Sequence, residues 1–163
     1  MNNELHPLEI ERKFLVASDN LPVNLTAYPQ KRIHQGYIVA NEEIGVRLRL
    51  KGELCYITVK SGQGITRSER EGLISRDTFD ELWPTTNGQR VEKVRYELPG
   101  PNGLTFELDI YEGHLHGLIT VEAEFDSIGD AERFQPPDWF GLDVTDDLRY
   151  TNSCLAKEGI PAR

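Results

Sequence analysis

The chain carries the stretch Glu9-Ile10-Glu11-Arg12-Lys13 close to its start. In a β-strand, residues two positions apart point to the same face, so Glu9, Glu11 and Lys13 would share one face, with Leu8 and Ile10 on the other. Two carboxylates and an ammonium group on one face can hold a metal ion and a polyanion together if later strands repeat the pattern. This stretch therefore predicts a strand with one charged and one apolar face.

The bulk composition bounds the class of protein. The chain has 163 residues, of which 38% are hydrophobic and 28% are charged, which predicts one globular domain spanning residues 1–163. A net charge of −9 argues against nucleic-acid binding. No apolar stretch is long enough to cross a membrane, and the first residues do not resemble an export signal. We therefore expect a cytoplasmic protein, with Cys55 and Cys154 reduced and with neither nucleic acid nor a membrane as a partner.

Period-two alternation predicts a mainly β fold with a few helices. The expected strands are residues 5–16, 31–40, 44–51, 54–60, 65–75, 89–98, 103–112 and 118–126. Short turns such as Gly52-Glu53 join several of them, so neighbours should be antiparallel. Eight such strands predict a closed antiparallel barrel, an architecture that leaves no exposed strand edges and can enclose a small ligand.

Three helices are expected outside the strands. Ser75 is a candidate N-cap for a short helix that ends before Pro84, and Ser127 for a second that ends before Pro136. Thr145 is a candidate N-cap for a third helix, from about 146 to 158, near one mouth of the barrel. Gly159 has the residue type that often follows a helix C-terminus.

The charges of the later strands are sorted by sign. Alternation alone favours the ordinary wet face of an antiparallel sheet, with cross-strand ion pairs. Here, however, the polar positions are mostly Glu, Asp, Arg and Lys, with acids on the first and last strands and bases on the third, fourth and sixth. Grouped carboxylates repel one another unless a cation lies among them, and grouped bases repel unless an anion does. A complex of a divalent metal with a polyphosphate satisfies both groups.

The ordered motifs resemble the CYTH superfamily, the triphosphate tunnel metalloenzymes. Glu9-Ile10-Glu11-Arg12-Lys13 is similar to the ExExK motif of that family. The resemblance continues, in the family's order, through Arg47-Leu48-Arg49, Thr58-Val59-Lys60, Glu69-Arg70-Glu71, Glu92-Lys93-Val94-Arg95, Glu107-Leu108-Asp109 and Val121-Glu122-Ala123-Glu124. It implies an eight-stranded barrel whose apolar faces point outward under helices carrying Trp83, Phe134 and Trp139, while the charged residues line a tunnel.

The same resemblance implies roles for individual residues. The acidic, metal-binding side corresponds to Glu9, Glu11, Asp109, Glu122 and Glu124. The basic side that grips phosphates corresponds to Lys13, Arg47, Arg49, Lys60, Lys93 and Arg95, with Tyr37 near the substrate. The catalytic candidates are Lys13, Glu69 and Glu71. Related proteins often close one tunnel mouth with a basic residue of the C-terminal helix, and here Arg149 is the only basic residue early in that segment.

The expected function is Mg²⁺- or Mn²⁺-dependent hydrolysis of inorganic triphosphate, because the chain most resembles the short bacterial members of the family. The partner is then inorganic triphosphate or another small triphosphate, and the protein is a monomer or a homodimer. The alternatives are a nucleoside triphosphatase, a thiamine triphosphatase, a class IV adenylyl cyclase or a non-catalytic polyphosphate-binding module. An ordinary ligand-carrying barrel is disfavoured because it would place apolar side chains inside.

Overall fold

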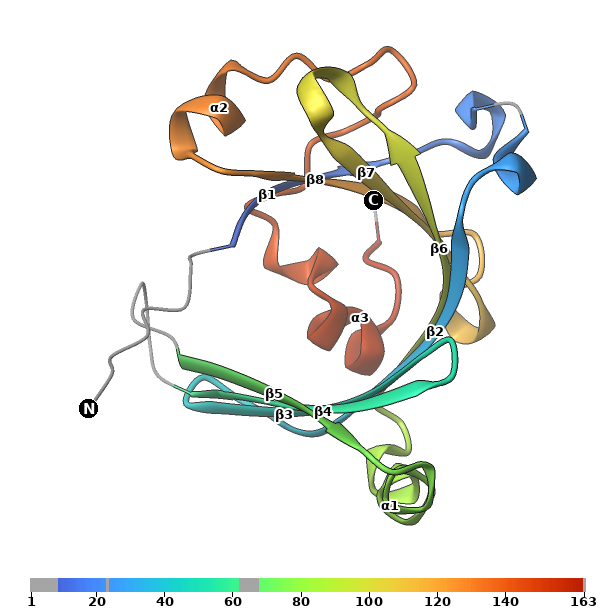
Figure 1. Ribbon diagram of the computed structural model, residues 1–163, viewed down its shortest axis with the longest axis vertical. Helices are drawn as coiled ribbons and strands as arrows, with labels where there is room; N and C mark the ends of the chain where they lie inside the picture. Colours follow the sequence, from blue (N-terminus) through green and yellow to red (C-terminus); the bar gives the residue numbers. More distant parts are fainter. Residues whose placement is uncertain (1–8, 23, 62–67, 163) are drawn as a thin grey trace.

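The alternating stretches form one antiparallel β-sheet in the computed structural model, which describes residues 9–22, 24–61 and 68–162 (Figure 1). Its strands are β1 (Ile10–Leu15), β2 (Gln30–Ala40), β3 (Ile44–Lys51), β4 (Leu54–Ser61), β5 (Ser68–Ile74), β6 (Arg90–Pro99), β7 (Thr105–Tyr111) and β8 (Ile119–Phe125). The order across the sheet is β1-β8-β7-β6-β2-β3-β4-β5. The expected antiparallel, mainly β architecture is confirmed. The first residues of two expected strands, 5–8 of the strand 5–16 and 65–67 of the strand 65–75, lie outside the described residues.

The closed barrel is not confirmed. The sheet curls around the C-terminal helix, and β1 and β5 are its two edge strands, with no hydrogen-bonded ladder between them in the described part of the chain. The segment 141–144 instead runs along the free edge of β1. The Leu15 N–H donates to the Leu142 carbonyl at 2.8 Å, and the Val144 N–H donates to the Lys13 carbonyl at 2.8 Å. This segment satisfies edge groups of β1 that a closed barrel would pair with another strand.

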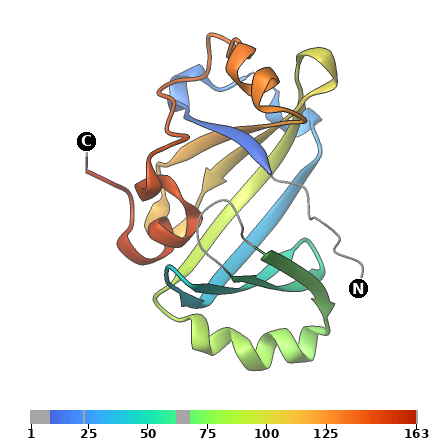
Figure 2. The same ribbon diagram turned by 90° about the vertical axis from the view of Figure 1, so that its left-hand side faces the viewer.

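The sheet is apolar on its outer, convex face. Leu48 on β3 and Cys55 on β4 pack under Phe79 of α1 (Arg76–Leu82), with Trp83 partly buried against them. Figure 2 shows α1 running along the outside of the strands that precede it. On the other half of the sheet, Phe14 and Val121 belong to a second cluster with α2 (Ile128–Arg133) and the segment after it; this cluster includes Phe134 and contacts Trp139. The expected outward packing of the apolar faces is therefore confirmed.

The helices begin at capping side chains. The Ser75 hydroxyl accepts a hydrogen bond from the Thr78 N–H, and the Ser127 hydroxyl accepts one from Asp130, so both expected N-caps are confirmed. The remaining short helices have 3-10 geometry: η1 (Ser18–Asn20), η2 (Leu25–Ala27), η3 (Trp83–Thr86), η4 (Pro101–Gly103), η5 (Gly113–Leu115) and η6 (Leu148–Tyr150). In the described part of the chain, no helix has the length and apolarity needed to span a membrane.

The prediction of one C-terminal helix capped by Thr145 is wrong. The segment divides into η6 and α3 (Asn152–Glu158), and Thr151 caps α3 by accepting from the Cys154 N–H, while Gly159 follows its last residue as expected. Thr145 is used elsewhere, because its hydroxyl accepts a hydrogen bond from the Lys13 N–H at 3.1 Å. Tyr150 and Leu155 are buried in a third cluster that includes Tyr37 and Tyr111. This cluster fixes the C-terminal segment against one end of the curled sheet.

Gly36 on β2 offers a direct test of the packing between the sheet and η3. A β-carbon at this position would lie 2.5 Å from Cβ of Thr86, which is fully buried and bonded to the Trp83 carbonyl and to Arg90. We expect Gly36→Ala to lower the free energy of unfolding by about 1–3 kcal/mol, measured by urea titration. Gly72→Ala is the matched control, since nothing lies within 4 Å of its added carbon. Equal stability of the two variants would contradict the packing.

Candidate functional site

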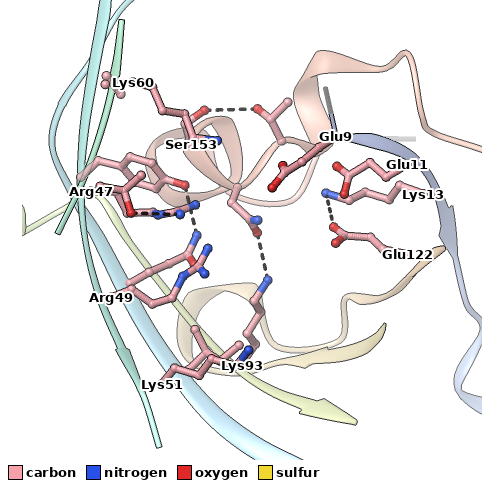
Figure 3. Close-up of a pocket in the computed structure, with 18 of the residues that line it drawn as sticks. Glu9, Glu11, Lys13, Arg47, Arg49, Lys51, Lys60, Lys93, Glu122 and Ser153 are labelled. Carbon is pink, nitrogen blue, oxygen red and sulfur yellow. Dashed lines mark hydrogen bonds and ion pairs between the residues drawn. The ribbon is translucent and has the colours of Figure 1, made fainter. Parts of the chain in front are cut away.

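The inner face of the curled sheet surrounds a charged cavity of about 560 Å³. Figure 3 shows its two sides: Arg47, Arg49 and Lys60 project from β3 and β4, opposite Glu9 and Glu11 at the other edge of the sheet. Most of the residues expected from the sequence line this cavity, namely Glu9, Glu11, Lys13, Tyr37, Arg47, Arg49, Lys60, Lys93, Arg95, Glu122 and Glu124. Asp109, Glu69 and Glu71 are not among the lining residues.

The acidic side comes from the pairing of β1 with β8. The register places Glu11 opposite Glu124, and Lys13 opposite Glu122. Burial in the cavity and the nearby Glu122 raise the pKa of Glu11 to about 7, with Lys13 acting in the opposite direction. Like charges directly across two strands are destabilising, so this side carries negative charge that is not fully compensated.

This donor set suits a hard divalent cation, because carboxylate oxygens are the ligands that Mg²⁺ and Mn²⁺ prefer. The opposed Glu11 and Glu124, with Glu9 beside them in the cavity lining, supply such oxygens, and among the described residues none of the three is in an ion pair closer than 4 Å. Within the described ranges, however, no three His, Cys, Asp or Glu side chains are gathered closely enough to enclose a metal. The chemistry of the residues therefore fits the cation, and the carboxylates would have to approach one another to ligate it.

Lys13 is held from two sides. Its ammonium lies 2.9 Å from Glu122 Oε1 and donates to the Tyr150 carbonyl at 3.2 Å. An ammonium has three N–H donors, so one remains for a group in the cavity. Lys13, the last residue of the opening motif, is thus a preoriented cation at the boundary between the acidic and the basic side.

The basic side has unsatisfied donors. Buried Nε atoms of Arg47 and Arg49 have no hydrogen-bond partner among the described residues. No carboxylate among the described residues lies within 4 Å of the Arg49 guanidinium. The Arg47 guanidinium, by contrast, lies 3.5 Å from the Glu71 carboxylate. Burial and the neighbouring Arg47 lower the pKa of Arg49. Two adjacent guanidinium groups with free donors form a site that an anion would stabilise.

Glu69 and Glu71 lie on β5 beside the basic side, directly across from Lys60 and Thr58 of β4. The Glu69 carboxylate is 3.3 Å from Lys60. Glu71 accepts a hydrogen bond from the Thr58 hydroxyl at 2.7 Å, and Thr58 in turn accepts one from Arg47 at 3.3 Å. These contacts orient the bases and leave neither carboxylate on the cavity wall.

Asp109 is the centre of a buried ion cluster. It has no exposed surface, and its carboxylate is 2.7 Å from Lys93 Nζ and accepts two 2.7 Å hydrogen bonds from Arg95. Burial alone would raise the pKa of Asp109, but Lys93 and Arg95 outweigh it and hold the pKa well below its usual range. Asp109, which was expected to bind the metal, is thus paired with Lys93 and Arg95, the two bases that were expected to bind phosphate.

Tyr37 lies among the bases, as expected from the sequence. Its hydroxyl accepts a hydrogen bond from the Gln35 amide at 3.1 Å, and both side chains line the cavity. Burial raises the pKa of Tyr37, although Arg47 and Arg49 act in the opposite direction. The phenol is therefore a neutral donor at neutral pH.

Several lining residues had been given no site role from the sequence. Glu107 and Lys51 alternate in step with predicted site residues on their strands, so they belong to the same charged face, and both line the cavity. Asn152 also lines the cavity, but only the fold brings the start of α3 to this place. Arg149, the expected basic residue of the C-terminal segment, is exposed and paired with Asp147 instead.

The pKa of Glu11 gives a testable pH dependence. Because its pKa is about 7 in the folded protein and 4.5 in a model compound, the folded state binds this proton more tightly than the unfolded state. The group therefore costs stability as pH rises from about 4.5 to 7, a cost that is complete above the folded pKa. We expect Glu11→Gln to be more stable than the parent at pH 8 in EDTA but not at pH 4.5, as measured by urea unfolding. The difference should stay below about 1 kcal/mol, because Glu11 is only partly withdrawn from solvent and water screens its charge. A difference that is independent of pH would contradict this.

Comparisons with known proteins agree with this geometry. No protein-family model matches the chain. The inorganic triphosphatase of Nitrosomonas europaea is 45% identical over 154 residues, which are 91% of this chain and 96% of that protein. The inorganic triphosphatase of Acetivibrio thermocellus is 36% identical over 155 residues, which are 91% of this chain and 93% of that protein.

The fold agrees with the same relatives. A crystal structure of an inorganic triphosphatase matches with a TM-score of 0.75 and 43% identity, covering 96% of this chain and 99% of that one. The likeness in sequence and in structure therefore extends over nearly the whole length of both proteins. The chain belongs to the inorganic triphosphatase family of the CYTH superfamily, as its ordered motifs predicted.

Proposed function

We propose that this protein hydrolyses inorganic triphosphate to pyrophosphate and phosphate with the help of a divalent cation. The observation that carries the proposal is the pair Arg47 and Arg49, whose buried Nε donors are without partners in the described part of the chain and face a carboxylate-lined wall. Such a cavity fits a compact polyanion that brings cations with it. Membership of the inorganic triphosphatase family supports the same substrate.

The bases would bind and orient the substrate. Arg47 and Arg49 can each present a planar fork of N–H donors to phosphate oxygens, while Lys60 and Lys13 add point charges. Phosphoryl transfer depends mainly on position and electrostatics, so holding the chain of phosphates in line accounts for a large part of the rate. Lys13, which keeps one donor free, is our candidate for stabilising the oxygen that leaves.

The carboxylates of Glu9, Glu11 and Glu124 would hold the cation. Mg²⁺ or Mn²⁺ at this place would supply charge neutralisation for the phosphates and a more acidic attacking water. Glu122, already paired with Lys13, contributes charge to the same side. In this proposal Asp109 positions Lys93 and Arg95, and Glu69 and Glu71 position Lys60 and Arg47.

The proposal also includes the tunnel. If the substrate is held between β3 and β1, the two halves of the curled sheet act as opposite walls around it. The open sheet would then enclose the substrate as a closed barrel does. Figures 1 and 2 support this, because the strands wrap around a common interior in Figure 1 and the C-terminal segment lies to one side of the strands in Figure 2.

A phosphate-release panel tests the proposal. We expect release from triphosphate with Mg²⁺ or Mn²⁺, less from ATP and thiamine triphosphate, little from pyrophosphate and none in EDTA. Glu11→Gln should abolish most of the activity, while Glu132→Gln, an exposed carboxylate on α2, should not. Triphosphate that binds without being cleaved would favour a polyphosphate-binding module, and preferred cleavage of a nucleotide would favour the nucleoside alternatives.

A further inference from the structure

The carboxamide of Asn152 lies at the end of the cavity that the C-terminal segment covers. It belongs to the first turn of α3 and lines the same cavity as the bases. The only basic residue early in this segment, Arg149, is exposed and paired with Asp147. The C-terminal segment therefore presents a neutral side chain to the cavity, at the mouth that related proteins often close with a basic one.

The orientation of this carboxamide is fixed by its neighbours. Its Oδ1 accepts hydrogen bonds from the Tyr111 hydroxyl at 3.0 Å and from Lys93 Nζ at 3.4 Å. A lysine ammonium can only donate, so the atom that faces Lys93 must be the oxygen. Tyr111 and Lys93 are each 1% exposed, and Lys93 is fixed by Asp109. Oδ1 of Asn152 is thus held in place by the immobile ammonium of Lys93.

The opposite end of the carboxamide carries two N–H donors. Asn152 lines the cavity, and with Oδ1 held by Lys93 and Tyr111, its Nδ2 has no acceptor among the described residues. Two preoriented neutral donors next to a cluster of cations suit a phosphoryl oxygen, because a hydrogen bond to a charged oxygen is among the stronger ones.

We propose that Asn152 is a further substrate-binding residue whose Nδ2 donates to a terminal phosphoryl oxygen of the triphosphate. The assignment rests on the proposed function for the identity of the substrate. It gives the C-terminal segment a role in recognition that does not depend on a basic residue.

The decisive variant is Asn152→Asp. Aspartate has the same shape and keeps an oxygen for Lys93 and Tyr111, but it replaces the donors with a carboxylate oxygen. We expect the KM for triphosphate and its Kd, measured by calorimetry in EDTA, to rise at least about tenfold, with kcat changed less than about threefold. Asn152→Leu, which removes the donors without adding charge, should raise both by about five- to tenfold.

Asn41→Asp is the matched control for charge. Asn41 also lines the cavity, and its Oδ1 accepts from the Glu43 and Ile44 N–H groups, contacts that aspartate can keep. We expect its KM and Kd to rise less than about threefold, since the added charge lies on a solvent-exposed turn. If KM and Kd rise equally in Asn152→Asp and Asn41→Asp, the added negative charge alone explains the effect, and the proposal is overturned.

A purely structural role predicts the opposite result. A carboxylate at position 152 would strengthen the bond to Lys93, so Asn152→Asp would melt higher and bind triphosphate as the parent does, which would also overturn the proposal. The binding measurement separates this proposal from the proposed function. A parent protein that binds triphosphate but does not cleave it would refute the hydrolysis and leave the role of Asn152 supported if the two variants bind more weakly.

Discussion

Asp109→Ala is expected to lower the free energy of unfolding by about 3–5 kcal/mol, because it leaves Lys93 buried without its carboxylate. Lys93 is 1% exposed and Asp109 is not exposed at all, so water cannot replace the lost partner. Arg95 would lose its two hydrogen bonds to Asp109 but keep Glu107, at 2.5 Å. Urea unfolding at neutral pH measures the loss.

A double variant separates charge from packing. In Lys93→Met/Asp109→Leu both members of the pair become apolar, and replacing a whole buried pair is often close to neutral. We therefore expect the double variant to be more stable than Asp109→Ala alone. Asp80→Ala, which breaks an exposed pair with Arg76 on α1, is the control and should lower the free energy of unfolding by less than about 1 kcal/mol. If the double variant is less stable than the single one, the ion cluster is not the cause of the loss.

The sequence predicted the two sides of the site because strands alternate with period two. Glu11 and Lys13, and likewise Arg47 and Arg49, were assigned to one face by spacing alone, and the structure brings them to one cavity. Spacing does not reveal which strands are neighbours. β2 lies between β6 and β3, so the meeting of Lys93 with Arg47 and Arg49 in one cavity depends on a non-sequential pairing that no local pattern encodes.

Parity also does not reveal how far a side chain reaches into the cavity. Asp109 has the parity of Glu107 on β7, yet the longer side chains of Lys93 and Arg95 cover it. The start of the C-terminal helix was harder to predict than the site strands. Thr145 and Thr151 are equally good caps by composition, and the choice between them is made by the edge of β1, which binds Thr145. Tertiary contacts of this kind explain why the helix start and Asn152 escaped prediction.

Arg49→Ala should give the largest loss of activity without a loss of stability. Removal of one preorganised donor to a transferring group typically costs 10²- to 10³-fold, and we expect a decrease of about that size in kcat/KM for triphosphate. Arg49→Lys should lie between alanine and the parent, since lysine keeps the charge but not the planar fork. Steady-state phosphate release measures both, and Arg70→Ala, an exposed arginine on β5, is the control.

The same Arg49→Ala variant should be at least as stable as the parent. Burial and the like charge of Arg47 lower the pKa of Arg49, which means that the folded, ligand-free protein bears a cost for keeping this cation charged. Arg49→Ala should therefore melt at the same temperature as the parent or higher, while the rise in melting temperature on adding triphosphate becomes smaller. A variant that loses both activity and stability would show that Arg49 mainly supports the fold. A variant that keeps its activity would remove Arg49 from the substrate site, because an unpaired guanidinium is stabilised here only if an anion is its partner.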